Sequence, residues 1–254
     1  MDFINKVVVI TGASSGIGAA AAVLYSKQSA KLVLVGRNEE ALNDVAKQCE
    51  EAKGIKPLVV KADLTVDEDV QNIVKSTIEA FGGIDVLVNN AGVGFHGSIR
   101  DGIELLDRAF ASNLRSAYLL TSLATPYLIQ SKGNVVNVSS VAGIKPIPQL
   151  KLLPYSVTKA GIDQFTRCVA LELAPYGVRV NSVNPGCTKT PFLGAAGFSE
   201  ETAIKAFENL CKNNPLRKVV EPEEIADYML YLSSDRARSI TGSIRVIDNG
   251  EMLI

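Results

Sequence analysis

The sequence predicts an α/β fold, in which a single doubly wound domain spans residues 1–254 and carries a seven-stranded, mainly parallel sheet with helices on both faces. Short runs rich in β-branched residues alternate with longer helical stretches along the chain. The short runs are almost continuously apolar, which is typical of strands covered on both faces. Their spacing of roughly 25 residues fits right-handed strand–helix–strand crossovers.

The elements follow from these patterns in chain order. The expected strands occupy residues 6–11, 31–36, 57–62, 84–89, 134–139, 178–183 and 243–247. The expected helices occupy residues 16–28, 39–53, 67–81, 102–131, 154–175, 200–213 and 222–232. Acidic residues at 67 and 68 support one helix start, because the positive end of the helix dipole favours negative charge.

Composition excludes several classes of protein. The chain has 26 Lys+Arg and 27 Asp+Glu, so it lacks the basic surplus of a nucleic-acid or anionic-membrane binder. It has neither an 18-residue apolar run nor a basic-then-apolar leader, and we expect a cytoplasmic protein with no membrane partner. Four cysteines without a CxxC pair, and a single histidine, His96, argue against a metal site and against a serine hydrolase.

A glycine-rich turn, TGASSGIG, joins the first strand to the first helix at residues 11–18. We expect Gly12 to permit the turn, Gly16 to let a phosphate approach the backbone, and Gly18 to let the helix pack closely. Ser14, Ser15 and Ile17 complete the expected loop. The spacing is G-x-x-x-G-x-G, and an ordinary strand-to-helix turn is the alternative.

The end of the second strand distinguishes the two nicotinamide dinucleotides. NAD sites place an acid there for the ribose 2′-hydroxyl, whereas this chain has Arg37, which can pair with a 2′-phosphate. We therefore expect NADP(H) in preference to NAD(H). A solvated surface charge is the alternative for Arg37.

Tyr155 and Lys159 lie four residues apart in a helical pattern and share one helix face. A nearby ammonium lowers the pKa of a phenol, so Tyr155 can serve as a general acid or base. Ser140, at the end of the fifth strand, can bond a substrate carbonyl, and Asn113 can hold a water behind Lys159. The alternatives are a surface Tyr–Lys pair, a strand-end cap and a satisfied core amide.

These motifs together resemble the short-chain dehydrogenase/reductase family in its single-domain, Rossmann-type form. The likeness covers essentially the whole chain: TGASSGIG at 11–18, ADLT with Asp63, NNAG at 89–92, Tyr155-x-x-x-Lys159, and Asn184-Pro185-Gly186. The resemblance implies a catalytic tetrad of Asn113, Ser140, Tyr155 and Lys159. It also implies cofactor contacts from Asp63, Leu64, Asn90, Ala91, Gly92, Pro185, Gly186, Thr188 and Thr190, besides the glycine loop, Arg37, Tyr155 and Lys159.

One departure concerns the serine. Ser140 precedes Tyr155 by 15 residues, about two more than the family spacing. Ser139 therefore stays open as an alternative to Ser140, although the SVAG sequence that begins at Ser140 favours the latter.

A long apolar segment at about 187–215 is expected to form a substrate loop or lid, with Gly194 and Gly197 as hinges. With the loop at 141–154, it predicts a hydrophobic alcohol or ketone substrate of steroid, terpenoid or aromatic type. In this family the helices at 102–131 and 154–175 build oligomer interfaces, so the resemblance implies a homotetramer. We expect His96 to be a loop residue rather than a substrate contact.

The leading hypothesis is thus an NADP(H)-dependent oxidoreductase that moves a hydride between nicotinamide and a secondary alcohol or ketone. Three alternatives remain: a catalytically weak nucleotide-sensing or scaffold protein, an NAD-dependent dehydrogenase of a polar alcohol, and a nucleotide-sugar epimerase or dehydratase. The last usually needs additional C-terminal chain for the sugar.

Overall fold

The computed structural model describes residues 3–53, 55–147 and 150–254, without the side chain of Leu210. Seven parallel strands form one sheet in the order β3-β2-β1-β4-β5-β6-β7. The strands are β1 (Val7–Thr11), β2 (Lys31–Gly36), β3 (Leu58–Lys61), β4 (Val86–Asn89), β5 (Asn134–Val138), β6 (Arg179–Pro185) and β7 (Ile244–Ile247). The strand order reverses between β1 and β4, which places a crevice at the carboxyl edge there.

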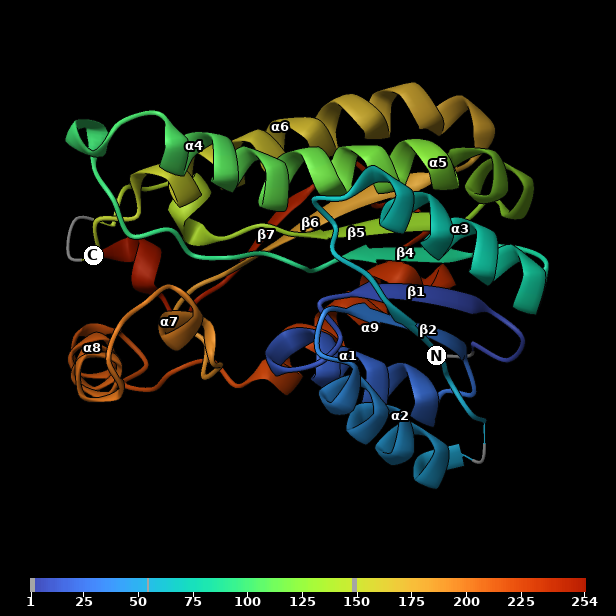
Figure 1. Cartoon of the computed structure of the whole chain (residues 1–254), viewed down its shortest axis with the longest axis horizontal. Helices are drawn as coiled ribbons and strands as arrows, with labels where there is room; N and C mark the ends of the chain where they lie inside the picture. Colours follow the sequence, from blue (N-terminus) through green and yellow to red (C-terminus); the bar gives the residue numbers. More distant parts are fainter. Residues whose placement is uncertain (1–2, 54, 148–149) are drawn as a thin grey trace.

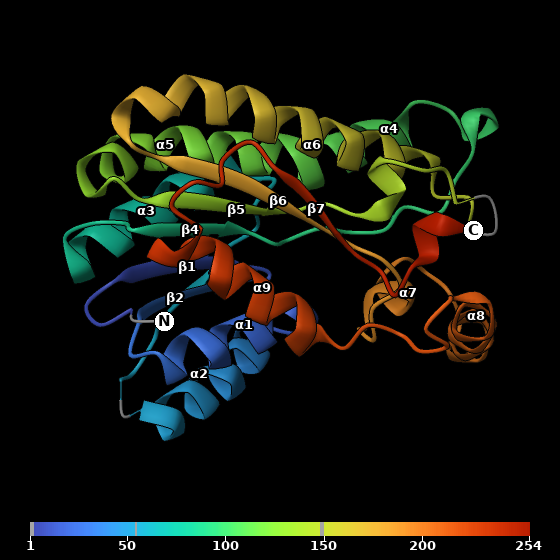
Figure 2. The same cartoon turned by 180° about the vertical axis from the view of Figure 1, so that it is seen from behind.

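Helices cover both faces of the sheet (Figures 1 and 2). One layer holds α1 (Gly16–Lys27), α2 (Glu39–Lys53) and α9 (Pro222–Ser233). The other holds α3 (Asp67–Phe81), α4 (Glu104–Ala109), α5 (Ser116–Ser131) and α6 (Leu153–Leu173). Figure 1 shows α7 (Phe192–Ala195) and α8 (Glu200–Asn213) beyond one end of the sheet.

The core is two-sided because successive side chains of a strand point to opposite faces. Val8 and Ile10 of β1 belong to the cluster with α1, α2 and α9, whereas Val7 and Val9 belong to the cluster with α3, α5 and α6. All five residues of β1 are buried. The prediction of strands covered on both faces is confirmed for β1, β2, β4, β5 and β6, whereas the edge strands β3 and β7 are partly exposed.

The expected strands match the observed ones to within two residues at each end. The expected helix over residues 102–131 is wrong as a continuous α-helix: it consists of α4, a π-helix η2 (Phe110–Arg115) and α5. The helix expected at 154–175 is observed as α6, Leu153–Leu173, and the 3₁₀ turn η5 (Ala174–Tyr176) follows it directly. Within the described residues, sequence patterns missed α7 and the short helices η1 (Ile99–Asp101), η3 (Val141–Gly143), η6 (Asp235–Ala237) and η7 (Glu251–Leu253).

The π-helix has a polar cause. Asn113, at its centre, is buried, and its side chain bonds both backbone groups of Val93 as well as the hydroxyl of Thr158. π-Helical turns inside α-helices often occur where a side chain makes specific polar contacts of this kind.

The loop expected at 141–154 contains Pro148 and Gln149, which lie outside the described residues.

No helix in the described part of the chain has both the length and the hydrophobicity needed to cross a membrane.

Candidate active site

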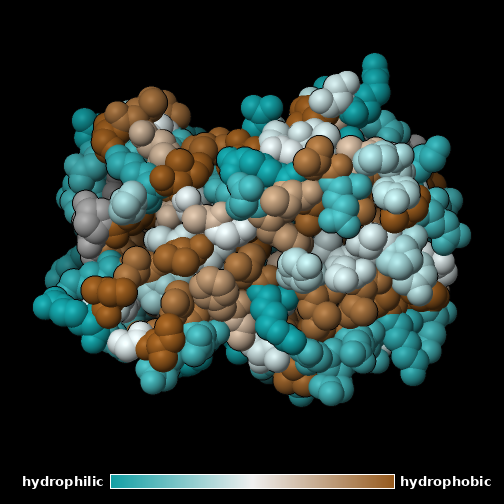
Figure 3. All heavy atoms as spheres, turned by 90° about the horizontal axis from the view of Figure 1, so that it is seen from above, coloured by the Kyte–Doolittle hydropathy of each residue, from teal (hydrophilic) through white to brown (hydrophobic). Residues whose placement is uncertain are grey.

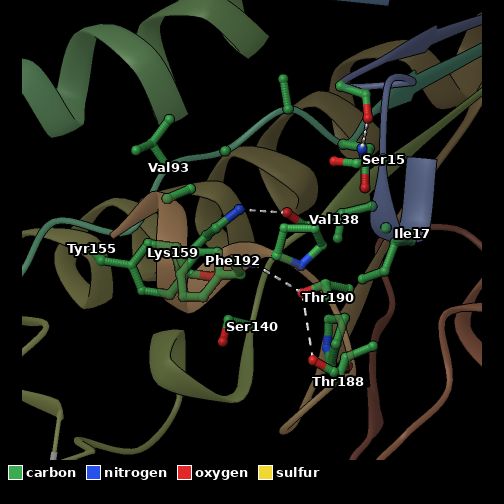
Figure 4. A pocket seen from close by; sticks show the side chains of 18 of the residues that line it. Ser15, Ile17, Val93, Val138, Ser140, Tyr155, Lys159, Thr188, Thr190 and Phe192 are labelled. Atoms are coloured by element: carbon green, nitrogen blue, oxygen red, sulfur yellow. Dashed lines mark hydrogen bonds between the residues drawn. The ribbon is translucent and has the colours of Figure 1, made fainter. Parts of the chain in front are cut away.

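A cleft of about 380 Å³ opens at the carboxyl edge of the sheet, beside the strand-order reversal. We call one part the glycine-loop end; it is lined by Gly12, Ser14, Ser15, Gly16, Ile17, Arg37, Asp63, Leu64, Asn90, Ala91 and Gly92. We call the other part the tyrosine end; it is formed by Ser140, Tyr155, Lys159 and Phe192. Figure 4 shows Ser15 and Ile17 across the cleft from Tyr155 and Lys159.

The glycine loop is shaped by close backbone contacts. Gly12 has a φ of +65°, which favours glycine, and a Cβ on Gly18 would lie 2.2 Å from the carbonyl oxygen of Gly12. Gly18 is buried beneath the loop and does not line the cleft, so it acts through packing, as its place in the motif predicts.

The turn after β4 clamps this loop to β1. Asn90 donates through Nδ2 to the carbonyl oxygens of Thr11 and Gly12, at 2.8 and 3.1 Å. The hydroxyl of Thr11 accepts hydrogen bonds from the backbone N–H groups of Asn90 and Ala91, both at 3.0 Å. The loop conformation is therefore fixed by both strands.

The amino end of α1 fits an anionic phosphate. Ser15 is the N-cap residue, but its side chain makes no capping hydrogen bond to the helix. The first N–H groups of α1 therefore lack a side-chain acceptor, and the helix dipole adds positive potential there. A Cβ at Gly16 would lie 3.0 Å from the Thr190 side chain on the facing wall of the cleft, so glycine at this position keeps a cradle open that suits the pyrophosphate of a dinucleotide.

The rim beyond β2 carries opposite charges. Arg37 is exposed and lines the cleft together with Asp63. Asp63 accepts hydrogen bonds from the backbone N–H and the hydroxyl of Thr65, at 2.9 and 2.7 Å. These bonds, and more weakly the charge of Arg37, hold the pKa of Asp63 below its usual value, so it remains a carboxylate.

Tyr155 is 8% exposed, because the ring of Phe192 covers it at a centroid distance of 5.1 Å. Burial raises the pKa of Tyr155 to about 12, while the neighbouring Ser140 hydroxyl acts in the lowering direction. The expectation that Lys159 lowers this pKa stays a prediction, because burial and the Ser140 hydroxyl are the causes of the shift in this structure.

Lys159 is also buried, at 3% exposure. Its ammonium donates to the carbonyl oxygen of Val138 at 2.7 Å and lies 5.5 Å from the centroid of the Tyr155 ring (Figure 4). Burial lowers the pKa of Lys159 to about 8, against the opposing effect of Asp163. The cation thus lies within reach of the phenol ring from the inner side of the cleft.

The two candidate serines have different environments. The Ser139 hydroxyl donates to the backbone oxygen of Lys159 at 2.9 Å, inside the protein. The Ser140 hydroxyl accepts a hydrogen bond from the N–H of Ala142 at 3.1 Å and affects the pKa of Tyr155. Ser140 is therefore the serine whose hydroxyl lies with the phenol, despite the longer spacing (Figure 4).

Asn113 lies behind this group and does not line the cleft. Its Oδ1 accepts from the N–H of Val93 at 2.8 Å, and its Nδ2 donates to the Val93 oxygen at 3.0 Å and to Thr158 at 3.2 Å. Its amide is thus satisfied by protein atoms, which agrees with the core-amide alternative.

The segment after β6 forms another wall. Pro185, Gly186, Thr188 and Thr190 all line the cleft, as their motif predicts. Thr188 donates to the Gly186 oxygen at 2.9 Å, and Thr190 accepts from the N–H of Phe192 at 3.4 Å. These contacts lead the chain from the sheet edge into α7, so that Phe192 comes to lie over Tyr155.

The outer wall at the tyrosine end is apolar. Its side chains are Ile147, Leu150, Leu152, Phe192 and Phe207. His96 does not belong to it; its ring lies edge-on to Phe198 at 5.2 Å, outside the cleft lining. An exception to the apolar character is Glu251, whose carboxylate accepts from the N–H of Cys187 at 2.9 Å.

Comparisons with known proteins agree with this geometry. The family model described as enoyl-(acyl carrier protein) reductase matches residues 12–251. A solved short-chain dehydrogenase/reductase of unknown function from Caenorhabditis elegans, with cofactor, covers 99% of this chain and 97% of its own, at 35% identity and a TM-score of 0.93. This chain belongs to the short-chain dehydrogenase/reductase family.

Two further relatives are informative about this short-chain dehydrogenase/reductase. An uncharacterized oxidoreductase of Thermotoga maritima is 36% identical over 256 residues, covering all of both chains. The L-sorbose reductase of Gluconobacter frateurii, solved with NADPH and L-sorbose, covers 100% of this chain and 99% of its own, at 30% identity and a TM-score of 0.92. The protein is an oxidoreductase acting on CH–OH or C=O groups, in a family that uses nicotinamide cofactors.

Sequence reasoning missed the polar groups that support the site. Thr11 and Thr158 carry hydroxyls that hold the glycine loop and Asn113, and Val138 supplies the acceptor of Lys159. Asp163 and Asn184 form a buried pair behind Ser140. Thr11 and Asn184 stand inside motifs quoted from the sequence, although without these roles, and Asp163 carries a spacing signal because it follows Lys159 by four residues.

Proposed function

We propose that this protein is an NADP(H)-dependent reductase or dehydrogenase that interconverts a secondary alcohol and a ketone. The observation that carries the proposal is the position of Tyr155, Lys159 and Ser140 at one end of a cleft whose other end offers a phosphate cradle. The bound dinucleotide would supply the hydride acceptor or donor. The protein would bind and orient both molecules and handle the proton.

The proposed roles follow from the contacts. Gly12 to Ile17, Asn90 to Gly92 and Pro185 to Thr190 would hold the dinucleotide along the carboxyl edge of the sheet. Tyr155 would donate the proton to the oxygen of a ketone, or accept it from an alcohol. Ser140 would bond the same oxygen, and Lys159 would stabilise the phenolate. Asn113 would hold the loop after β4 in place behind these residues, through its two hydrogen bonds to the Val93 backbone.

A single substitution tests the chemistry. Tyr155→Phe removes the proton donor but keeps the ring, so carbonyl reduction by NADPH should fall by about 10²- to 10⁴-fold. NADPH binding, followed by fluorescence, should persist. Tyr176→Phe, which removes a hydroxyl from an exposed ring, is the matched control. Unchanged turnover in Tyr155→Phe would refute the mechanism.

The preference for NADP(H) rests on Arg37. Its side chain lies at the rim of the glycine-loop end, where a 2′-phosphate would form charge-assisted hydrogen bonds with it. Arg37→Ala should weaken NADPH binding by about 10- to 100-fold and leave NADH binding nearly unchanged. Arg100→Ala, at another exposed arginine outside the cleft, should change neither affinity. Tighter NADH than NADPH binding in the wild type would contradict the proposal.

The apolar wall supports a hydrophobic substrate. Ile147, Leu150, Leu152 and Phe192 would bury a steroid-, terpenoid- or aromatic-type carbonyl compound next to Tyr155. The alternative is a polar alcohol, favoured by Glu251 in the lining and by the similarity to an L-sorbose reductase. The two alternatives are separated by measuring turnover of bulky apolar ketones and of ketoses, each with NADPH and with NADH. Higher kcat/KM for the apolar ketones supports the hydrophobic substrate, and higher kcat/KM for the ketoses contradicts it.

A catalytically weak nucleotide sensor or scaffold is the second candidate. Burial of Tyr155 and its raised pKa would fit a phenol that takes no part in proton transfer. Measurable turnover on either half of the substrate panel, lost in Tyr155→Phe, excludes this candidate.

A homotetramer and a cytoplasmic location complete the proposal. Figure 3 looks onto the layer that holds α5 and α6 and shows hydrophobic residues among hydrophilic ones. Tyr118 and Leu171, 62% and 80% exposed, would be covered by a second copy. Sedimentation velocity measures the size of the assembly.

The four cysteines, all free thiols, suit a reducing compartment such as the cytoplasm, and cell fractionation checks this location.

A further inference from the structure

A buried carboxylate lies behind the tyrosine end and has no part in the proposed function so far. Asp163 follows Lys159 by one helical turn on α6, so that the two side chains share a helix face. Asp163 is 4% exposed and Lys159 is 3% exposed. Charged side chains are almost never buried to this extent unless they are paired, so the two require a common explanation.

The Asp163 carboxylate is held by neutral donors from β6. Asn184 donates through Nδ2 to both carboxylate oxygens, at 3.0 and 2.9 Å, and the Ser182 hydroxyl lies 3.4 Å from one of them. These bonds favour the ionised form, whereas burial acts against it and raises the pKa of Asp163 overall. A cation close to the carboxylate would compensate the buried charge.

The same amide of Asn184 reaches the strand end that carries Ser140. Its Nδ2 also donates to the backbone oxygen of Ser140 at 3.0 Å. On the other side, the Ser139 hydroxyl donates to the backbone oxygen of Lys159. The ends of β5 and β6 and the first turns of α6 are therefore joined through Asp163 and Asn184 into one hydrogen-bonded unit.

Few charged groups act on this unit. Lys159 and Arg167, both on α6, are the cations that attract the Asp163 carboxylate, and Tyr155 is the other titratable group beside Lys159. The strand β6 and the residue that follows β5 face the pair with neutral side chains, those of Ser182, Asn184 and Ser139.

We propose that Asp163 is a positioning residue, which keeps Lys159 in its ammonium form within the protein and, through Asn184, fixes the backbone at Ser140. This inference rests on the proposed function, because Lys159 and Ser140 are assigned there. Its test therefore includes a measurement that needs neither turnover nor cofactor.

That measurement is the titration of Lys159 by NMR in protein labelled with carbon-13 at the lysine ε-carbon. The Lys159 resonance is assigned by its loss in Lys159→Arg. In the wild type, Lys159 should be an ammonium at pH 7, and in Asp163→Asn its midpoint should move down by about one pH unit, which is a tenfold weaker proton affinity. A neutral Lys159 at pH 7 in the wild type, or an unchanged midpoint in the variant, overturns the proposal.

Kinetics then separate the charge from the hydrogen bonds. Asp163→Asn removes the charge, so kcat/KM should fall about tenfold at pH 9 yet stay close to wild type at pH 6.5. Asn184→Ser keeps the Asp163 carboxyl and offers it a hydroxyl donor in place of the amide, but it breaks the link to Ser140, so it should lower kcat with the pH dependence of the wild type. Losses that are independent of pH in both variants would show a purely structural role and refute the charge effect.

Folding is controlled separately. Thermal melts and NADPH binding report whether each variant is native, and Asp163→Ser, which keeps a hydroxyl for Asn184, replaces Asp163→Asn if the latter does not fold. The wild-type titration of Lys159 needs no variant at position 163. If the wild type turns over no carbonyl substrate at all, the proposed function fails while this titration still decides the charge effect.

Discussion

The two ends of the cleft are held in different ways. At the glycine-loop end, backbone atoms and close contacts fix the shape, because Asn90 and the neighbouring backbone leave no room for a side chain at Gly12 or Gly18. At the tyrosine end, buried side chains set the chemistry, because desolvation raises the pKa of Tyr155 and lowers that of Lys159. A substitution at the first end should therefore act through geometry, and one at the second through proton affinity.

The largest effect is expected at Gly18. A Cβ at this position would lie 2.2 Å from the Gly12 oxygen and 2.5 Å from Nδ2 of Asn90, so Gly18→Ala must displace the loop. We expect NADPH binding to be lost and stability to fall by about 3 kcal/mol. Gly194→Ala is the matched control, because a Cβ there meets nothing within 4 Å. Titration calorimetry measures the NADPH affinity and denaturant melts measure the stability. Equal affinity and stability in the two variants would show that close contacts do not fix the glycine loop.

A smaller effect is expected at Thr11. Thr11→Val keeps the shape but leaves the N–H of Ala91 without its acceptor, whereas the N–H of Asn90 also bonds the Val88 oxygen at 3.1 Å. The free energy of unfolding should fall by about 1 kcal/mol, since one part-buried donor loses its partner. Thr202→Val, at an exposed threonine, should stay within about 0.5 kcal/mol of the wild type. A loss as small as that of the control would mean that the clamp contributes little.

The smallest effect on stability, and the sharpest on proton affinity, is expected at Phe192. Phe192→Ala uncovers Tyr155, so the desolvation that raises its pKa to about 12 is reduced. The phenol should then ionise at lower pH, closer to its ordinary value of about 10. The increase in phenolate absorbance on alkaline titration, compared with the Tyr155→Phe background, measures this. An unchanged titration midpoint would show that Phe192 does not cause the desolvation of Tyr155.

The same contrast explains what the sequence could predict. The strands and the glycine loop were predictable because apolar runs and glycines act locally, and the observed strands β1 to β7 agree closely with them. The π-helix at Asn113 was not predictable, because its cause is a contact with Val93, which lies 20 residues earlier in the chain. The burial that raises the pKa of Tyr155 likewise involves a distant contact, because the ring of Phe192, outside the YxxxK motif, lies 5.1 Å from the ring of Tyr155. Apolar periodicity does not encode such contacts.

Gly94 shows what this packing implies for engineering the enzyme. A Cβ there would lie 2.7 Å from Cβ of Ala196 and 2.8 Å from the Phe192 ring. Mutant libraries that diversify position 94 alone will consist mostly of proteins in which α7 is pushed away, whatever substrate is chosen for selection. A larger residue at position 94 therefore requires smaller residues at both 192 and 196 in the same variant.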